Sequence, residues 1–196
     1  MEKDNIQKLL IDIGRKIVCD KGTEALTARK LSEASGCSVG AIYNQFSNMD
    51  NFVVIQNFMT LEALYTKLRD IPESGENFAD TNNLVQAFVD FVLENKNLWY
   101  LLFNFHLTHP DRVYSVYYLR KVVDIVHLLN NIIMKSVPDM ERPERMLSSQ
   151  ILWLCLFALS SFLAKDVLEP FGKADKKTIC HILVNTYIAG LTVLEK

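Results

Sequence analysis

The sequence lacks an excess of charge of either sign, and it contains few of the residues that interrupt helices. Its 196 residues include 21 Lys and Arg against 23 Asp and Glu, which gives a formal net charge of −2. Residues 1–70 hold nine of each kind, so the N-terminal part has no basic excess. Any binding of nucleic acid must therefore depend on a local patch. The presence of only seven Gly and five Pro favours long helices over a turn-rich β fold.

The motifs of the common enzyme classes are also missing. There is no G-x-S-x-G, no phosphate-binding loop, no G-x-G-x-x-G and no H-E-x-x-H. The one cluster with metal-ligand character is His106, His109 and Asp111, but Pro110 interrupts the helix that the two histidines would share. We therefore expect no catalytic residue, no metal and no cofactor, and we predict that the chain is not an enzyme.

Cysteine pairs and long apolar runs are absent as well. None of the four cysteines belongs to a C-x-x-C pair, which is typical of reduced residues that pack in a cytoplasmic protein. The first five residues are polar and mixed in charge, unlike a signal peptide. The most apolar run, residues 151–164, has fourteen residues, whereas spanning a bilayer takes about 20. We expect a soluble cytoplasmic protein without a membrane partner.

What the sequence does contain is a clear local pattern at residues 27–46, which indicates two short helices joined by a tight turn. Thr27 can cap the first helix, because its hydroxyl can accept a hydrogen bond from an unpaired backbone N–H. Gly36 suits a helix end that requires a positive φ. Ser38 then provides a second N-cap. The spacing predicts a helix-turn-helix.

The second helix of this pair has two different faces. Val39, Ile42 and Phe46 recur at i, i+3 and i+7, which predicts a buried apolar stripe. The opposite face is small or polar, contains no acid and can hydrogen-bond base edges or phosphates; it comprises Gly40, Ala41, Tyr43, Asn44 and Gln45. Such a helix suits a DNA major groove. An ordinary helix pair in an all-α protein is the alternative.

Residues 6–52 resemble the DNA-binding domain of the tetracycline-repressor (TetR) family. The most specific features are the strings Ser35-Gly36-Cys37-Ser38 and Ile42-Tyr43-Asn44-Gln45-Phe46, because a general helix-turn-helix does not require that Tyr and Phe. The resemblance implies a DNA-binding site formed by Thr27, Arg29, Lys30, Ser38, Gly40, Ala41, Tyr43, Asn44 and Gln45. We expect Thr27, Lys30 and Tyr43 to contact phosphates, and Arg29, Asn44 and Gln45 to contact base edges.

One position departs from the family pattern. The family usually has a Lys three residues after the Phe, where it meets a phosphate, and this chain has Met49. The substitution removes one expected phosphate contact, so it bears on affinity rather than on fold.

The remaining chain also reads as helical. No segment alternates with period 2 over a sustained length, so the predicted fold class is all-α. After a linker at residues 71–82, which contains Pro72 and Gly75, the pattern predicts helices at about 84–93, 98–107, 110–136, 143–165 and 174–194. We predict two domains: a three-helix DNA-binding domain at residues 1–48, and a helical bundle for ligand binding and dimerisation at residues 49–196.

Aromatic residues concentrate in this second part, with fifteen of twenty beyond residue 70. Large aromatics with few charges nearby are typical of an apolar ligand pocket, although a plain helical core uses the same residues. The family resemblance implies a pocket, and our candidate ligand-binding residues are Phe88, Phe91, Trp99, Phe103, Tyr117 and Trp153. The expected effector is a small apolar or aromatic molecule.

The two last predicted helices carry apolar residues on more than one face. In the final helix, Ile179, Leu183, Thr186 and Gly190 form one stripe, and Cys180, Val184, Tyr187 and Leu191 form another. One face can serve the core while the other meets a second subunit, which predicts a homodimer. A helix that is fully buried in a monomer is the alternative.

These observations favour a ligand-responsive transcriptional regulator, a repressor that leaves a palindromic double-stranded DNA operator when its effector binds. Two other classes remain. Met49 and the neutral N-terminal region also fit a helical small-molecule-binding protein with weak or lost DNA binding. A small helical enzyme is the third class, and the missing motifs speak against it.

Overall fold

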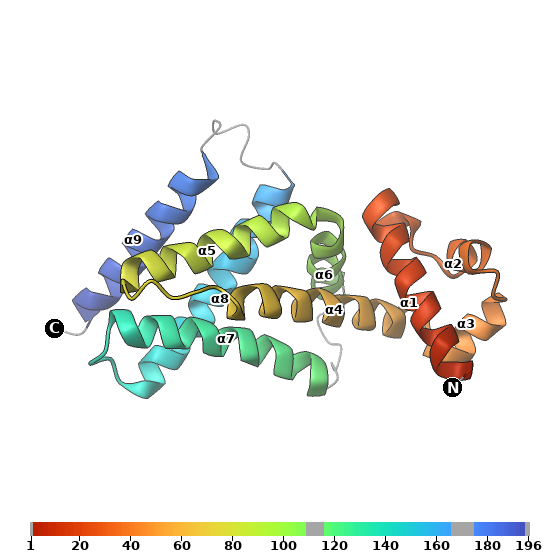
Figure 1. The fold of residues 1–196 in the computed structure, drawn as a ribbon, viewed down its shortest axis with the longest axis horizontal. Helices are drawn as coiled ribbons and strands as arrows, with labels where there is room; N and C mark the ends of the chain where they lie inside the picture. Colours follow the sequence, from red (N-terminus) through yellow and green to blue (C-terminus); the bar gives the residue numbers. More distant parts are fainter. Residues whose placement is uncertain (1, 109–115, 166–174, 195–196) are drawn as a thin grey trace. The chain divides into compact units, whose positions relative to one another are not determined.

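The structure, a computed structural model, describes residues 2–108, 116–165 and 175–194. In these residues the chain forms nine α-helices and one short 3₁₀ turn, and no β-strand (Figure 1). The elements are α1 (Glu2–Lys21), η1 (Thr23–Ala25), α2 (Ala28–Ser35), α3 (Val39–Phe46), α4 (Met49–Arg69), α5 (Asn77–Glu94), α6 (Lys96–Thr108), α7 (Val116–Ser136), α8 (Arg142–Ala164) and α9 (Lys176–Leu194). The predicted all-α fold is confirmed.

Contacts within the chain divide it into two compact units. Unit 1 comprises Met1–Glu62 and Asn95–Tyr118, and unit 2 comprises Ala63–Glu94 and Leu119–Lys196. Helix α4 contributes its first residues to unit 1 and its last to unit 2. The predicted boundary after residue 48 lies inside unit 1, and the division into two functional domains stays a prediction.

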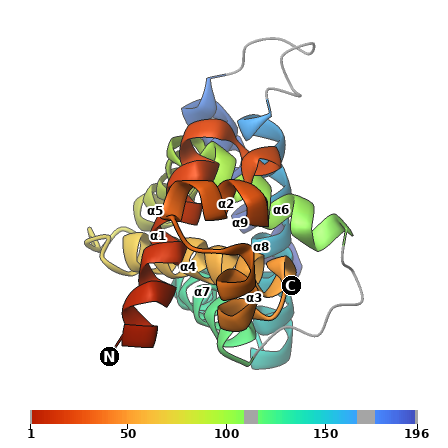
Figure 2. The same cartoon turned by 90° about the vertical axis from the view of Figure 1, so that its right-hand side faces the viewer.

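The core of unit 1 holds the helix-turn-helix together. Helix α1 packs against α2, η1 and α6, and α2 packs against α3; Figure 2 shows α2 and α3 joined by their short turn. The buried side chains of this core are Leu10, Ile17, Ala25, Leu31, Ile42, Phe46 and Phe52. A smaller cluster around Val18, Leu98 and Leu101 adds α6. The apolar face of α1, which includes Leu10 and Ile17, therefore positions both short helices.

Helix α1 approaches α4 closely at a glycine. A Cβ atom at Gly14 would lie 2.4 Å from Cζ of Phe52, which is fully buried. Polar groups continue this contact: the Gln56 amide donates to the Ile11 carbonyl at 2.8 Å, and Arg15 Nη1 donates to Thr60 Oγ1 at 3.3 Å. Burial lowers the pKa of the Arg15 guanidinium.

The linker between α4 and α5 is shorter than predicted. We expected it at residues 71–82, but α5 begins at Asn77. Both the backbone N–H and the hydroxyl of Ser74 donate to Asp80 at 2.7 Å, so the turn closes onto the first turns of α5. These hydrogen bonds, led by the one from the Ser74 hydroxyl, lower the pKa of Asp80. Pro72 and Gly75 led us to extend the linker beyond the true start of α5, because the sequence pattern does not show the contact between Ser74 and Asp80.

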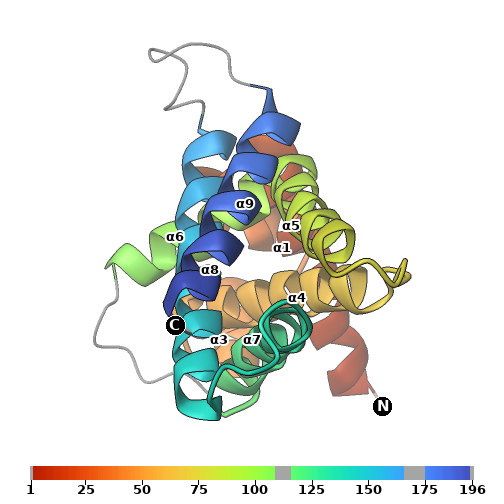
Figure 3. The same cartoon turned by 90° about the vertical axis from the view of Figure 1, so that its left-hand side faces the viewer.

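Unit 2 is a helical bundle in which α5 packs against α8 and α9 (Figure 3). Its buried side chains include Phe88, Leu129, Leu156 and Val184. Helix α9 is joined to α8 by Tyr187, whose hydroxyl donates to the Ser148 carbonyl at 2.5 Å. Burial raises the pKa of Tyr187 to about 12.

Helix α8 is the one helix in the described part of the chain that is long and apolar enough to cross a bilayer. The sequence prediction counted only residues 151–164, whereas the helix begins at Arg142 and so passes the test of length. Core helices of soluble proteins pass the same test, and 39% of the apolar window is buried inside this structure. Length and composition alone therefore do not assign a membrane span.

Candidate nucleic-acid interface

The first helix of the motif begins as predicted. The Thr27 hydroxyl accepts a hydrogen bond from the Lys30 backbone N–H at 3.2 Å. Leu31 is fully buried, and this leaves Arg29 and Lys30 exposed on the outer side of α2. A cap and one buried anchor thus determine which side chains of this short helix face solvent.

The turn between the two helices is held by polar bonds that the sequence pattern did not reveal. Gly36 has a φ of 72°, the left-handed conformation that glycine adopts without strain. The Ser32 hydroxyl donates to the Cys37 carbonyl at 2.6 Å, and the Cys37 N–H donates to the Ser35 hydroxyl at 3.2 Å. The two serines are signals for such a turn in retrospect, since short hydroxyl side chains commonly bond nearby backbone.

Helix α3 presents the predicted polar face to solvent. The Ser38 hydroxyl accepts a hydrogen bond from the Ala41 N–H at 3.1 Å and so begins the helix. Ile42 and Phe46 are buried, whereas Tyr43 is 43% exposed. Gly40 and Asn44 are exposed as well, and Ala41 and Gln45 are partly buried.

The nine predicted DNA-binding residues therefore occupy the capped start of α2, the turn and α3, and none is fully buried. The hydroxyl oxygens of Thr27 and Ser38 serve as acceptors in the caps, and each hydroxyl also carries a donor hydrogen that suits a phosphate. The assignment of individual residues to phosphates or bases stays a prediction.

Charge on this surface is sparse. Arg29 and Glu33 form an exposed ion pair on α2, with Nε and Oε1 3.0 Å apart. An exposed pair at i, i+4 contributes only about 0.3–0.5 kcal/mol, so Arg29 can exchange Glu33 for another anion at little cost. Helix α3 contains no charged residue at all. The interface therefore offers hydrogen-bonding and apolar groups more than bulk positive charge.

The end of α3 is tied to the start of α4. Asn48 caps α4 by accepting a hydrogen bond from the Asn51 N–H at 2.8 Å, and the Asn51 side-chain amide donates to the Phe46 carbonyl at 3.0 Å. Ser47 between them has a φ of 67°. Met49, at the position of the usual family Lys, is partly buried and packs against the unit 1 core. The side chains of Asn48 and Asn51 thus hold the connection between α3 and α4.

The predicted ligand-binding aromatics fall in both units. Phe88, Phe91 and Trp153 belong to unit 2, where the rings of Phe88 and Trp153 meet edge to face at 5.8 Å. Trp99, Phe103 and Tyr117 belong to unit 1. Phe88, Phe91 and Trp99 are buried, Phe103 and Trp153 are partly buried, and Tyr117 is 77% exposed. A ligand-binding role for the six stays a prediction.

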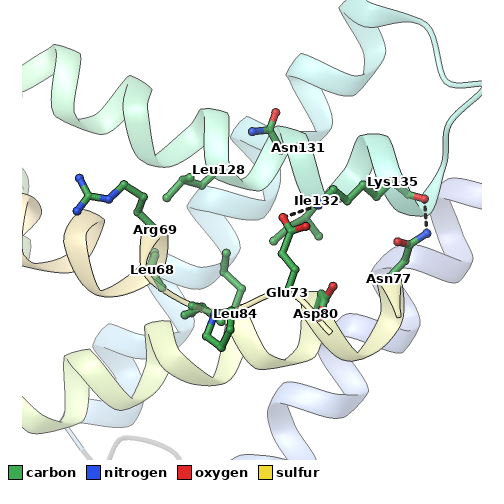
Figure 4. A pocket seen from close by; sticks show the side chains of 12 residues that line it. Leu68, Arg69, Glu73, Asn77, Asp80, Leu84, Leu128, Asn131, Ile132 and Lys135 are labelled. Atoms are coloured by element: carbon green, nitrogen blue, oxygen red, sulfur yellow. Dashed lines mark hydrogen bonds and ion pairs between the residues drawn. The ribbon is translucent and has the colours of Figure 1, made fainter. Parts of the chain in front are cut away.

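A different set of residues lines a cavity in unit 2, at the end of α4 and beside α5 and α7 (Figure 4). The cavity has a volume of about 580 Å³ including its solvent-open mouth. Leu68, Leu84 and Ile132 contribute apolar surface. At one rim, Lys135 pairs with Glu73, and Asn77 donates to the Lys135 carbonyl at 2.6 Å. None of the six predicted aromatics lines this cavity.

The histidine cluster considered as a metal site is only partly visible. His109 and Asp111 lie outside the described residues. His106 is partly buried, which lowers its pKa, and its Nε2 lies 2.7 Å from the Tyr118 hydroxyl. Within the described ranges, no group of three His, Cys, Asp or Glu side chains could hold a metal ion.

Comparison with known proteins agrees with this geometry. The family model described as "Bacterial regulatory proteins, tetR family" matches residues 10–54, which contain α2, α3 and the turn. A curated relative, the HTH-type transcriptional repressor KstR2 of Rhodococcus jostii (strain RHA1), is 29% identical over 82 residues. That match spans 41% of this chain and 38% of the relative, so the chain covers about two fifths of the relative's length.

Solved structures share the whole fold. A protein of unknown function from Rhodococcus sp. RHA1 has a TM-score of 0.74 at 16% identity, with 94% of each chain covered. BioQ bound to its double-stranded DNA operator has a TM-score of 0.65 at 13% identity, covering 92% of this chain and 95% of BioQ. At these identities the likeness establishes the fold alone.

The described chain combines an all-helical fold with an exposed helix-turn-helix. Residues 10–54 carry the helix-turn-helix of the tetR family of bacterial regulatory proteins. The proteins that this segment resembles are transcriptional regulators, which are not enzymes.

Proposed function

We propose that the protein is a repressor that binds a palindromic DNA operator as a homodimer and is released by a small apolar or aromatic molecule in the cytoplasm. The observation that carries the proposal is the exposed face of α3, which has no acidic residue. Side-chain caps at Thr27 and Ser38 begin α2 and α3. Two similar proteins support the same role: KstR2 is a transcriptional repressor, and BioQ binds a double-stranded DNA operator.

The DNA-reading part of the proposal assigns phosphates to Tyr43, Thr27 and Lys30, and bases mainly to Asn44 and Gln45. Tyr43→Ala is expected to weaken binding to every duplex, whereas Gln45→Ala is expected to change sequence preference. Fragments selected from random DNA, followed by anisotropy titrations of both variants, test this. Unchanged binding by both variants would refute the assignment.

The homodimer is proposed to form through α8 and α9. On α8, Leu147, Ile151 and Leu154 recur on one face and are exposed to solvent. On α9, the stripe containing Cys180, Val184 and Leu191 is buried, while Ile182 and Val193 on other faces are exposed. Exposed apolar faces of this kind mark interaction sites. A two-fold axis would separate two recognition helices by about 34 Å or a multiple, as a palindrome requires.

Light scattering tests the dimer, with an expected mass of twice 22.5 kDa. Leu154→Lys is expected to give monomers, because it places a charge in the proposed interface. Leu107→Lys is the matched control, since Leu107 is equally exposed but lies on α6. Monomeric wild-type protein at micromolar concentration, or monomers from both variants, would contradict the interface.

Release by an effector requires a structural element with two conformations, whose equilibrium shifts when either the effector or DNA binds. Helix α4 is the proposed element, because it directly follows α3 and its last residues, Leu68 and Arg69, line the cavity of unit 2. Coupling of this kind is typically about 1–3 kcal/mol, so operator affinity is expected to fall by ~5–150-fold. By thermodynamic linkage, binding of the operator must lower the affinity for the effector by the same factor. The test is to find an effector by thermal shift and to measure its affinity with and without saturating operator. Equal affinities would overturn the mechanism.

A second candidate function is a small-molecule-binding protein with weak DNA binding. It is favoured by Met49 and by the uncharged α3, which together reduce the number of phosphate contacts. A DNA affinity that depends weakly on salt and differs little between selected and random duplexes would support this alternative.

A further inference from the structure

Val39 occupies an unexpected place on the recognition helix. The sequence pattern put it on the buried stripe with Ile42 and Phe46, and this part of the prediction is wrong. Val39 is 38% exposed, whereas Ile42 and Phe46 are 0% and 4% exposed. The difference arises because Val39 is the first residue of α3, directly after the Ser38 cap, and the core clusters around the middle and the end of this helix.

The surface beside Val39 is open. Val39 and Tyr43 are four residues apart, so both lie on one side of the helix. The next residue, Gly40, has no side chain, and even an added Cβ would meet only Ser38 Oγ, at 3.9 Å. The branched side chain of Val39 therefore borders an unobstructed surface on the first turn of α3. In helix-turn-helix proteins, the N-terminal residues of the recognition helix contact base edges.

A valine on that turn can read only one feature of DNA. It has no donor or acceptor, and the apolar group that the major groove displays is the C5-methyl group of thymine. We propose that Val39 is a specificity-determining residue whose methyl groups contact the C5-methyl of a thymine in each operator half-site. This inference rests on the proposed DNA binding and adds a determinant to it: an A·T pair, with thymine on the contacted strand, at one defined position of each half-site.

Apolar readout suits an interface with so little charge. The other exposed residues of α3, such as Asn44, discriminate bases by hydrogen bonds, and α3 itself supplies no cation. Contact between the thymine methyl and Val39 removes apolar surface from water on both partners. It discriminates thymine from uracil, which differ only in that methyl group.

The test uses the full-length protein and a duplex selected from random DNA. Each thymine of one half-site is replaced in turn by deoxyuridine, and affinity is measured by anisotropy. At one position, wild-type protein is expected to lose about fourfold in affinity, the value of one buried methyl group. Val39→Ala is expected to bind more weakly and to reduce the deoxyuridine effect at that position to less than about twofold. Alanine favours helix formation, so α3 should persist in this variant.

Val123→Ala is the matched control, because Val123 is an exposed valine of α7 in unit 2; it should keep the full deoxyuridine effect. The proposal is overturned if no thymine responds to the replacement, or if Val39→Ala responds as strongly as wild type. Both results would leave sequence-specific binding intact. Failure of the proposed function looks different, because then no duplex is selected over random DNA, and the inference falls with it.

Discussion

The helix-turn-helix and the bundle of unit 2 are both helical, but different interactions determine their helix ends. In the first, hydroxyl and amide caps at Thr27, Ser38 and Asn48 begin three successive helices. In the second, Asp175 caps α9 by accepting from the Thr178 N–H at 3.2 Å, but α8 begins after Glu141 without a side-chain cap bond. Buried residues such as Leu129 and Leu156 position the helices. Local bonds thus begin every short helix of the DNA-reading segment, whereas the longest helix of the bundle, α8, relies on packing.

This difference suits the two tasks. Base recognition needs side chains held in one register, and short-range caps fix the register of a helix as short as α3. An apolar bundle tolerates rearrangement of its helices more readily, because burial is non-directional. The comparison leads to four predictions, given in order of decreasing expected effect.

The largest contrast is expected from the same substitution in the two units. Gly14→Ala in α1 should destabilise the protein by about 1–3 kcal/mol, because the new Cβ collides with the buried Phe52 ring. In α9, a Cβ at Gly190 would have no atom of the same subunit within 4 Å. Measured below the concentration at which subunits associate, Gly190→Ala should stabilise the subunit by up to about 1 kcal/mol through helix propensity. Urea unfolding measures both.

Phe52→Leu provides the internal check on this contrast. Combined with Gly14→Ala it should recover part of the lost stability, since the smaller side chain removes the collision. If Gly14→Ala alone stabilises the protein, α1 and α4 are not in close contact.

A buried amide on α4 offers the next contrast. Asn57 is fully buried, and neither of its amide atoms has a hydrogen-bond partner among the described residues. Asn57→Leu should therefore stabilise the protein by about 1–3 kcal/mol, the penalty of an unsatisfied buried polar group. Thr60→Val, on the same helix, should do the opposite, because the Thr60 hydroxyl bonds both Arg15 and the Gln56 carbonyl. Thermal and urea denaturation are the measurements. A destabilised Asn57→Leu protein would show that the amide is in fact satisfied.

The caps test the local character of the helix-turn-helix directly. Thr27→Ala and Ser38→Ala should each cost about 1 kcal/mol of folding stability, because each leaves a helix N–H unpaired. Glu141→Ala, at the start of α8, should change stability by less than about 0.5 kcal/mol, since Glu141 makes no cap bond. Equal losses of unfolding free energy at all three positions would show that the side-chain cap bonds do not distinguish the two regions. Stability is measured without DNA, so that lost contacts to the operator do not contribute.

The smallest effect is expected from Tyr187 in the bundle, and it depends on pH. Burial raises its pKa to about 12 in the folded protein, against about 10 in an unfolded chain. The folded state therefore favours neutral Tyr187. This contribution is fully present below about pH 10 and is lost as the pH rises towards 12. Tyr187→Phe should cost about 0.5 kcal/mol at neutral pH, the low end for a hydrogen bond, because it loses the bond to Ser148 at a partly buried position.

The same variant should also be less sensitive to alkaline pH. The difference in unfolding free energy between wild type and Tyr187→Phe is expected to shrink between pH 10 and 12. Tyr43→Phe, on the exposed face of α3, controls for the loss of a hydroxyl. A difference that stays constant over this range would refute a role for burial.

Where local chemistry decides the structure, the sequence predicted it well. The helix stop at Gly36 and the caps at Thr27 and Ser38 were all predicted from single residues and spacing. Predictions were less accurate where a distant contact intervened. The α4–α5 linker shortened because Asp80 binds the backbone and side chain of Ser74. Val39 was assigned to the core because it shares a helix face with Ile42 and Phe46. Periodicity identifies that face but does not show how far along the helix the core extends.

By itself the sequence determined the all-α class, the two short helices with their turn, and the polar face that α3 presents. These features follow from caps, a left-handed glycine and a 3.6-residue period, all of which act within a few residues. Only the tertiary structure decided which apolar stripe of α9 is buried, with Cys180, Val184 and Leu191 inside, and only it joined residues 95–118 to the N-terminal unit. The physical reason is that hydrophobic burial has no direction of its own, so an apolar side chain becomes core only where the rest of the chain covers it.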